Sequence, residues 1–151
     1  MIDAWYPPDV TTPAARLRYY AERFDTVEAD APFYAIPDRR VVENWAKRTP
    51  PGFTFHVKAF GMMTQHAVDE RALHPELREY PHAVERGRVK RPSQEMVDVA
   101  FDLFLESLEP LEETGKLGGI LMQFPPFFTA LDEAIKEENL AYIDYARGKL
   151  G

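Results

Sequence analysis

The sequence contains no cysteine among its 151 residues. This absence excludes disulfide bonds, cysteine-ligated zinc and a thiol nucleophile. No apolar run approaches the roughly 20 residues that a membrane-spanning helix needs. The first residues also lack the basic start and the apolar stretch of a signal peptide. We therefore expect a cytoplasmic protein without a membrane partner.

The motifs that mark common nucleotide-binding and hydrolytic sites are missing as well. The sequence has no Gly-x-Gly-x-x-Gly, no Walker loop, no Gly-x-Ser-x-Gly and no zinc-protease helix motif. Basic residues are in the minority, with 18 Lys and Arg against 25 Asp and Glu and a net charge of −7. This charge disfavours a protein that binds a polyanion over its whole surface, although it leaves a local basic patch open.

One local basic patch lies between positions 86 and 91 and consists of Arg86, Arg88, Lys90 and Arg91. It is a candidate for contact with the phosphate groups of a nucleic acid or a nucleotide. No aromatic residue that would stack on a base is interleaved with these side chains, which favours a solvated loop instead.

The sequence does contain a regular alternation of strands and helices. Its 45% hydrophobic and 13% aromatic residues suit one domain with a sizeable core. Capping residues and helical spacing of apolar residues predict four helices, over 13–23, 38–47, 93–109 and 131–150. Pro110 is expected to end or kink the third helix. Period-two alternation predicts three strands, over 26–30, 53–58 and 120–124. This order predicts an α/β fold with a parallel sheet and crossover helices.

Residues 61–93 lack this regularity, because three prolines interrupt them. A loop of that length is typical of a lid or a binding loop. Three histidines, His66, His74 and His82, recur there at intervals of eight, whereas zinc ligands on a helix usually stand four apart. We therefore expect surface histidines and no metal site, with a site role only for His66, which follows the second strand. The sequence identifies no cofactor.

Alternation within each strand assigns its side chains to two faces of the sheet. Phe53, Phe55 and Val57 are expected to pack on helices. The opposite face then gathers five polar side chains, Glu28, Asp30, His56, Lys58 and Gln123. Tyr34 follows the first strand and is expected to line a pocket at this face.

Polar groups near the carboxyl ends of parallel strands form the active sites of (β/α) barrels. The set fits general acid–base chemistry, with Glu28 or His56 as the base and Lys58 stabilising an anion. A second interpretation stays open, in which the same residues form structural ion pairs, for example Glu28 with Lys58.

Long ordered segments of the chain resemble one known family. These segments are RLRYYAERFDTVE at 16–28, PFYAIP at 32–37, WAKRTPPGFTFHVKA at 45–59, TQH at 64–66, and the stretch from GKLG to QFPP at 115–126. They resemble the YecE-like family, a domain of unknown function with the number 72. The resemblance implies a TIM-like barrel of about 250 residues whose activity is not established. It places Glu28, Lys58, His66 and Gln123 at recurring strand-end positions without giving them roles.

The chain also departs from the pattern of that family. Asp30 stands where many members carry Asn, and Ala31 where many carry Ser. Members usually begin with a strand of the Gly-Thr-Ser-Gly-Trp type and continue into a strand that contains Glu-Phe-Arg-His or similar residues. Residues 1–151 are therefore expected to form one partial barrel domain of three parallel strands and four helices. It would lack the usual first strand and the C-terminal half, and would be prone to self-association through its open sheet edges.

These observations lead to one main functional hypothesis and two alternatives. The main one is a barrel enzyme or ligand-binding protein for a small polar or phosphorylated molecule at the carboxyl ends of the strands. Glu28 would be a base or anchor, Lys58 an anion stabiliser, His66 a proton shuttle and Gln123 an orienting hydrogen-bond partner. The alternatives are a nucleic-acid-binding, endonuclease-like barrel and an inactive truncated fragment.

Overall fold

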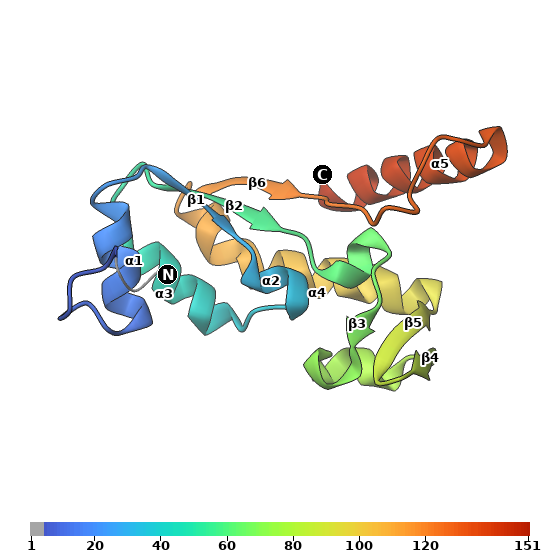
Figure 1. Cartoon of the computed structure of the whole chain (residues 1–151), viewed down its shortest axis with the longest axis horizontal. Coiled ribbons are helices and arrows are strands. Elements are labelled where there is room, and N and C mark those ends of the chain that lie inside the picture. Colours follow the sequence, from blue (N-terminus) through green and yellow to red (C-terminus); the bar gives the residue numbers. More distant parts are fainter. Residues whose placement is uncertain (1–4) are drawn as a thin grey trace.

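The computed structural model describes residues 5–151, in which helices pack on one face of a three-stranded sheet (Figure 1). In this part of the chain the α-helices are α1 (Pro13–Ala21), α2 (Ala31–Tyr34), α3 (Arg39–Arg48), α4 (Gln94–Glu113) and α5 (Glu133–Leu150). The strands are β1 (Thr26–Ala29), β2 (Thr54–Lys58), β3 (Val68–Asp69), β4 (His82–Glu85), β5 (Arg88–Pro92) and β6 (Leu117–Leu121). Three 3-10 helices are η2 (Gly61–Thr64), η3 (Glu70–Ala72) and η4 (Pro75–Glu79).

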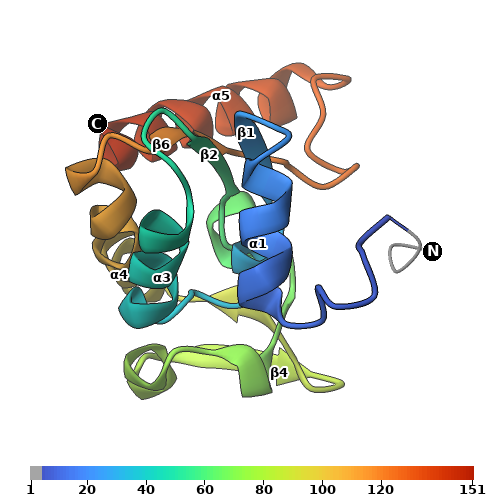
Figure 2. The same cartoon turned by 90° about the vertical axis from the view of Figure 1, so that its left-hand side faces the viewer.

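Strands β1, β2 and β6 form the main sheet, in that order, and all of them run parallel. Phe53, Phe55 and Val57 are buried in the core that this sheet forms with the helices. Helices α3 and α4 lie together on that side of the sheet (Figure 2). The α/β fold with three parallel strands is thereby confirmed. The sheet is open at both edges within residues 5–151, and barrel closure stays a prediction from the family resemblance.

The helices begin at the capping residues that the sequence indicates. Thr12 Oγ1 accepts a hydrogen bond from the Ala15 backbone N–H at 3.1 Å and so caps α1. Asp38 caps α3 in the same way, and Ser93 caps α4. Each side chain satisfies a backbone donor that has no partner inside the first turn.

Of the two outcomes expected at Pro110, an end or a kink of the helix, the end is ruled out, because α4 continues through this residue to Glu113. Proline has no N–H, so the carbonyl of Glu106, four residues earlier, loses its usual helical partner. Arg39 Nη1 from α3 donates to that carbonyl at 3.4 Å. The same guanidinium forms an ion pair with Glu109. A side chain from α3 thus replaces the hydrogen bond that the proline removes.

The third strand lies three residues earlier than predicted, at Leu117–Leu121 instead of 120–124. The glycines Gly118 and Gly119, which in the sequence indicate a chain break, are part of β6, and Gly119 pairs with His56 of β2. Gln123 consequently follows the strand and is exposed. The sequence pattern is misleading here, because glycines normally weaken a strand and signal a turn.

Residues 61–93 are not the irregular loop that was expected. They form η2, η3 and η4 together with a second sheet of order β3-β5-β4, which is antiparallel (Figure 1, lower right). Leu77 and Val89 are buried and anchor this small unit to the core. Its strands are two to five residues long, and such short segments give little detectable periodicity.

Helix α5 packs on α4 and η2 at the far end of the sheet (Figure 1). Ala146 is buried, and the Tyr142 hydroxyl donates to the Met63 carbonyl at 2.9 Å. The helical spacing in the sequence predicts that Ile135, Tyr142 and Ala146 face inward, and this prediction is confirmed for Tyr142 and Ala146. Ile135 is 44% exposed, so the same prediction is wrong for that residue.

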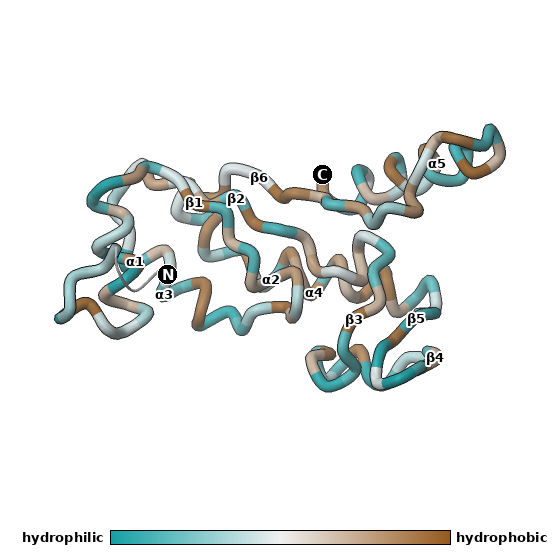
Figure 3. The backbone as a smooth tube through the Cα atoms, viewed as in Figure 1, coloured by the Kyte–Doolittle hydropathy of each residue, from teal (hydrophilic) through white to brown (hydrophobic). Residues whose placement is uncertain are grey.

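Along the sequence, stretches of apolar residues are short and alternate with stretches of polar residues (Figure 3). Among residues 5–151, no helix combines the length and the hydropathy that crossing a bilayer requires. The cytoplasmic location stays a prediction.

A carboxylate with two donors holds α5 on α4. The Tyr145 hydroxyl donates to Asp98 Oδ1 at 2.7 Å, and Lys149 Nζ lies 2.9 Å from the same oxygen. The Tyr145 hydrogen bond and then the Lys149 ammonium lower the pKa of the Asp98 carboxyl below its usual value. The carboxylate therefore stabilises the fold above the unfolded-state pKa of about 3.9, and this contribution is lost as the pH falls through the lower folded-state pKa.

We expect Asp98→Asn to lower the free energy of unfolding by about 1 kcal/mol at neutral pH, after allowance for solvent screening. The difference from the unmodified protein shrinks below about pH 4, because the native carboxylate is then protonated as well. Urea unfolding of both proteins from about pH 7 to about pH 3 measures this effect. A difference that is independent of pH would contradict the assignment.

Candidate functional site

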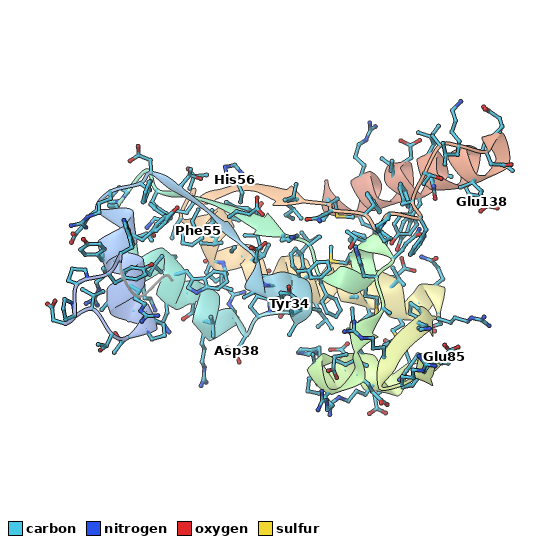
Figure 4. All side chains as sticks on the ribbon, in the orientation of Figure 1. Tyr34, Asp38, Phe55, His56, Glu85 and Glu138 are labelled. Atoms are coloured by element: carbon cyan, nitrogen blue, oxygen red, sulfur yellow. The ribbon has the colours of Figure 1, made fainter. Side chains whose placement is uncertain are left out.

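The face of the main sheet opposite the helices carries exposed polar side chains. His56 and Phe55 point to opposite sides of β2, with His56 exposed and Phe55 buried (Figure 4). The strand register sets Glu28 of β1 beside His56 of β2. A shallow pocket of about 280 Å³ on this face is lined by Glu28, His56, Gly119, Ile120 and Leu121. The predicted division into an apolar and a polar face is therefore correct for β1 and β2.

Four side chains form a tighter group where β1 and β2 end. This strand-end cluster consists of Asp30, Phe33, Lys58 and His66. Lys58 Nζ lies 3.3 Å from Asp30 Oδ1 and 5.4 Å from the centre of the Phe33 ring. The Phe33 and His66 ring centres are 5.0 Å apart, edge to face. Because parallel strands end at the same edge of a sheet, β1 and β2 bring these groups together.

The ion pair that Lys58 forms differs from the one that the structural interpretation of the sequence named. Lys58 pairs with Asp30 and not with Glu28. The Lys58 side chain is only 18% exposed, whereas that of Asp30 is 65% exposed. The ammonium is thus largely enclosed by protein, while its partner carboxylate stands mostly in solvent.

The proton positions of His66 follow from its hydrogen bonds. Thr64 Oγ1 donates its single proton to the Gly61 carbonyl at 3.1 Å and lies 2.9 Å from His66 Nδ1. Nδ1 must then be the donor in the second contact, since the hydroxyl has no further proton. The lone pair of the neutral imidazole is therefore on Nε2, which is the atom that can accept a proton.

The charge state of His66 follows from its surroundings. Burial, and to a smaller extent the nearby Lys58 charge, lowers the pKa of this imidazole from its usual value, and a hydrogen bond to the Thr64 backbone opposes the shift. At neutral pH the side chain is consequently a neutral base beside a cation. This combination suits proton abstraction from a bound anion or from a group next to one.

Two further predicted site residues, Tyr34 and Gln123, are not members of the strand-end cluster. Tyr34 is 70% exposed on α2 and stacks edge to face on Phe33, with ring centres 5.2 Å apart. Gln123 lies beyond β6 and does not share the strand face as predicted. Phe33 was missed as a site residue, although its position in the segment that follows β1, directly before Tyr34, was available as a signal.

The other histidines of the 61–93 segment have local structural roles. His74 Nδ1 accepts from the Glu76 N–H at 3.4 Å at the start of η4, and His82 Nδ1 lies 2.7 Å from the Tyr80 carbonyl. Among residues 5–151, His, Asp and Glu side chains do not form a group of three or more that could hold a metal ion.

The four basic residues of positions 86–91 lie on the β4–β5 hairpin, which follows the residues of the strand-end cluster in the sequence. Lys90 Nζ pairs with Glu85 at 2.8 Å, and Arg88 Nη1 donates to the Ala67 carbonyl at 3.0 Å. Local partners thus take up part of the charge that a nucleic acid would need. The hairpin location agrees with an exposed loop-like patch, and nucleic-acid binding stays an untested alternative.

The structure thus defines an α/β chain with a polar cluster at the carboxyl ends of two parallel strands. A family model described as "Protein of unknown function DUF72" matches residues 1–146, and the chain belongs to this family. It is 36% identical over 149 residues to the UPF0759 protein YunF of Bacillus subtilis (strain 168). The family resemblance inferred from the sequence motifs is thereby confirmed.

Solved structures of the family show the same fold in this region. The chain is similar to a DUF72 family protein (EF0366) of Enterococcus faecalis V583, with 29% identity, a TM-score of 0.63 and coverage of 92% of this chain. A second crystal structure of that protein gives 28% identity, a TM-score of 0.64 and coverage of 88%. The chain spans 43% of YunF and 45% or 39% of the two solved chains, which is less than half of each.

Proposed function

We propose that the strand-end cluster binds a small anionic molecule, most simply one that carries a phosphate group, and that His66 exchanges a proton with it. Lys58 is the anion contact in this proposal. Phe33 forms an apolar floor beneath both groups. The proposal concerns an enzyme or ligand-binding site of the family's α/β fold, and not the basic hairpin.

The incomplete pairing of Lys58 carries the proposal. An ammonium has three N–H donors, and in the described part of the chain its one carboxylate partner is Asp30. An ammonium that is largely removed from water is stabilised by further acceptors, and phosphate oxygens provide them. Asp30 is mostly exposed, so it can swing away when a stronger anion arrives.

The adjacent base gives the site a chemical use. His66 presents the Nε2 lone pair beside the same ammonium, because Nδ1 is committed to Thr64. A substrate anion held by Lys58 would have its developing negative charge stabilised while His66 takes up the proton. Glu28 and His56 lie further back along the strands and would contact the remainder of such a ligand in the shallow pocket.

We expect Lys58→Met to weaken binding of glycerol 3-phosphate or inorganic phosphate at least tenfold, which corresponds to about 1.4 kcal/mol. Calorimetric titration of each anion measures the affinity, and the NMR signals of the His66 ring report whether the anion binds at the cluster. The matched control is Lys90→Met, which also removes a lysine paired with one carboxylate. This control leaves the affinity within about twofold.

A second variant separates the proposed function from a structural ion pair. Asp30→Asn removes the competing carboxylate and tightens anion binding if Lys58 is a ligand contact. If the pair is only structural, Asp30→Asn lowers stability and leaves the affinity unchanged, which refutes the proposal. Failure of both anions to bind up to about 10 mM, or binding that Lys90→Met abolishes, refutes it as well.

A further inference from the structure

We propose that the ligand of the strand-end cluster is a phosphorylated polyol or open-chain sugar, whose hydroxyl groups lie in the shallow pocket beside Glu28 and His56. This inference rests on the proposed function, because it takes the phosphate at Lys58 as the fixed end of the ligand. It adds the chemical class of the rest of the molecule and the distance over which that part extends.

The pocket lies one same-face step back along the strands from the cluster. Glu28 stands opposite His56 in the register of β1 and β2. His56 and Lys58 are two residues apart on β2 and therefore point to the same side of the sheet. Two residues of a strand span about 7 Å. An extended chain covers this distance in about six bonds, so hydroxyls on about the third and fourth carbons from the phosphate reach the pocket.

The polar wall of the pocket offers both kinds of group that a hydroxyl uses in hydrogen bonding. Glu28 and His56 are exposed on the sheet face and line the pocket (Figure 4 labels His56). A carboxylate accepts hydrogen bonds, whereas an imidazole N–H donates them. Neighbouring hydroxyls of a polyol can satisfy both, because each hydroxyl is a donor and an acceptor. An ammonium has donors alone, and a second anionic group would be repelled by the Glu28 charge.

Glycines keep the β6 side of the pocket low. Gly119 lies opposite His56 in the strand register and contributes only backbone to the pocket lining. The register between β2 and β6 shifts at His56, which makes Gly118 the extra residue of a β-bulge. A Cβ at position 118 would lie 2.9 Å from His56 Cε1, so the ring lies directly against this glycine. Bulges and glycines of this kind occur where a strand is approached closely by a ligand.

The size and the apolar lining of the pocket fit a slender chain. Its volume of about 280 Å³ is just below the range of roughly 300–1,000 Å³ that drug-sized ligands occupy. Ile120 and Leu121 complete the lining, and Leu121 is 40% exposed. The C–H groups of a polyol can pack on these side chains while its hydroxyls turn toward the polar wall. The pocket therefore favours a hydroxylated chain over a bulky ring system.

Sorbitol 6-phosphate and hexyl phosphate test this inference, because they carry the same phosphate on the same number of carbons and differ in their hydroxyls. We expect calorimetric titration to give about tenfold tighter binding of sorbitol 6-phosphate. NMR identifies the place of binding. The His56 ring signals should shift with sorbitol 6-phosphate and not with inorganic phosphate, whereas the His66 signals should shift with both.

Glu28→Ala should reduce the preference for sorbitol 6-phosphate to less than about twofold. The ratio of the two affinities is measured in each variant, so a general effect of the lost charge on phosphate binding cancels. Glu85→Ala is the matched control, since Glu85 is also an exposed glutamate on a strand, but on β4 of the other sheet. This control should retain the full preference.

The possible failures of the inference and of the proposed function are distinguishable. Equal binding of the two organic phosphates, or a preference that Glu28→Ala leaves intact, overturns the inference. The proposed function then stands if inorganic phosphate binds and Lys58→Met weakens its binding. If inorganic phosphate does not bind, the proposed function fails, and the inference that rests on it fails as well.

Discussion

Lys116→Met is expected to lower the free energy of unfolding by about 3 kcal/mol, because three buried acceptors lose their donor. Lys116 Nζ lies 2.6 Å from the Ala46 carbonyl, 2.6 Å from the Thr49 carbonyl and 3.1 Å from Thr49 Oγ1. Carbonyls at the end of a helix have no partner within it. The positive ammonium also interacts favourably with the negative C-terminal end of the α3 dipole. Burial lowers the pKa of Lys116, whereas the three acceptors favour its protonated form.

Guanidinium chloride unfolding measures this loss, with Lys47→Met as the control. Lys47 is on the last turn of the same helix, but its side chain is 71% exposed and pairs only with Glu43 in the described chain. Its replacement changes stability by less than about 0.5 kcal/mol. Equal effects of the two variants would show that Lys116 does not secure the end of α3.

Gly118→Ala is expected to destabilise the protein by about 2 kcal/mol and to displace the His56 ring. A Cβ at position 118 would lie 2.2 Å from Thr54 Cγ2 and 2.9 Å from His56 Cε1. Both atoms belong to β2, so the added methyl group pushes β6 away from its only parallel partner in residues 5–151. Thermal unfolding measures the loss, and the NMR shifts of the His56 ring report its displacement.

Two further variants make the test of Gly118 specific. Gly148→Ala changes a glycine of α5 that has nothing within 4 Å of the added Cβ, and it raises stability by roughly 0.5–1 kcal/mol through helix propensity. Thr54→Ala removes the nearer obstacle and restores part of the stability of Gly118→Ala. If Gly118→Ala behaved like Gly148→Ala, the close approach of β6 to β2 would be refuted.

The sequence predicted the parts of the fold that local patterns determine. Caps at Thr12, Asp38 and Ser93 located three helix starts, and the alternation around Phe55 located β2 with its two faces. These features depend on neighbouring residues, which is why they can be read without a structure. The order of the predicted strands and helices then identified the α/β class.

The errors arose where distant residues determine the local structure. Helix α4 passes Pro110 because Arg39, from another helix, donates to the carbonyl that the proline leaves without a partner. Strand β6 begins at Leu117 because Lys116 and Gly118 fit against α3 and β2. Neither contact has a signature in the sequence around it. The same holds for the choice of Asp30 over Glu28 as the partner of Lys58, since both acids precede the lysine by a similar distance in sequence.

The antiparallel unit of residues 68–92 has a consequence for how fast the chain folds. This unit and α4 separate β2 from β6 in the sequence, so the pairing of these two strands closes a long loop. Closing such a loop costs entropy before any contact compensates for it. The hairpin of β4 and β5 forms from near neighbours, so it can fold early and shorten the path between the two parallel strands. We expect the rate-limiting step to be the pairing of β2 with β6, and Gly118 to be the residue at which this step is most sensitive to added volume.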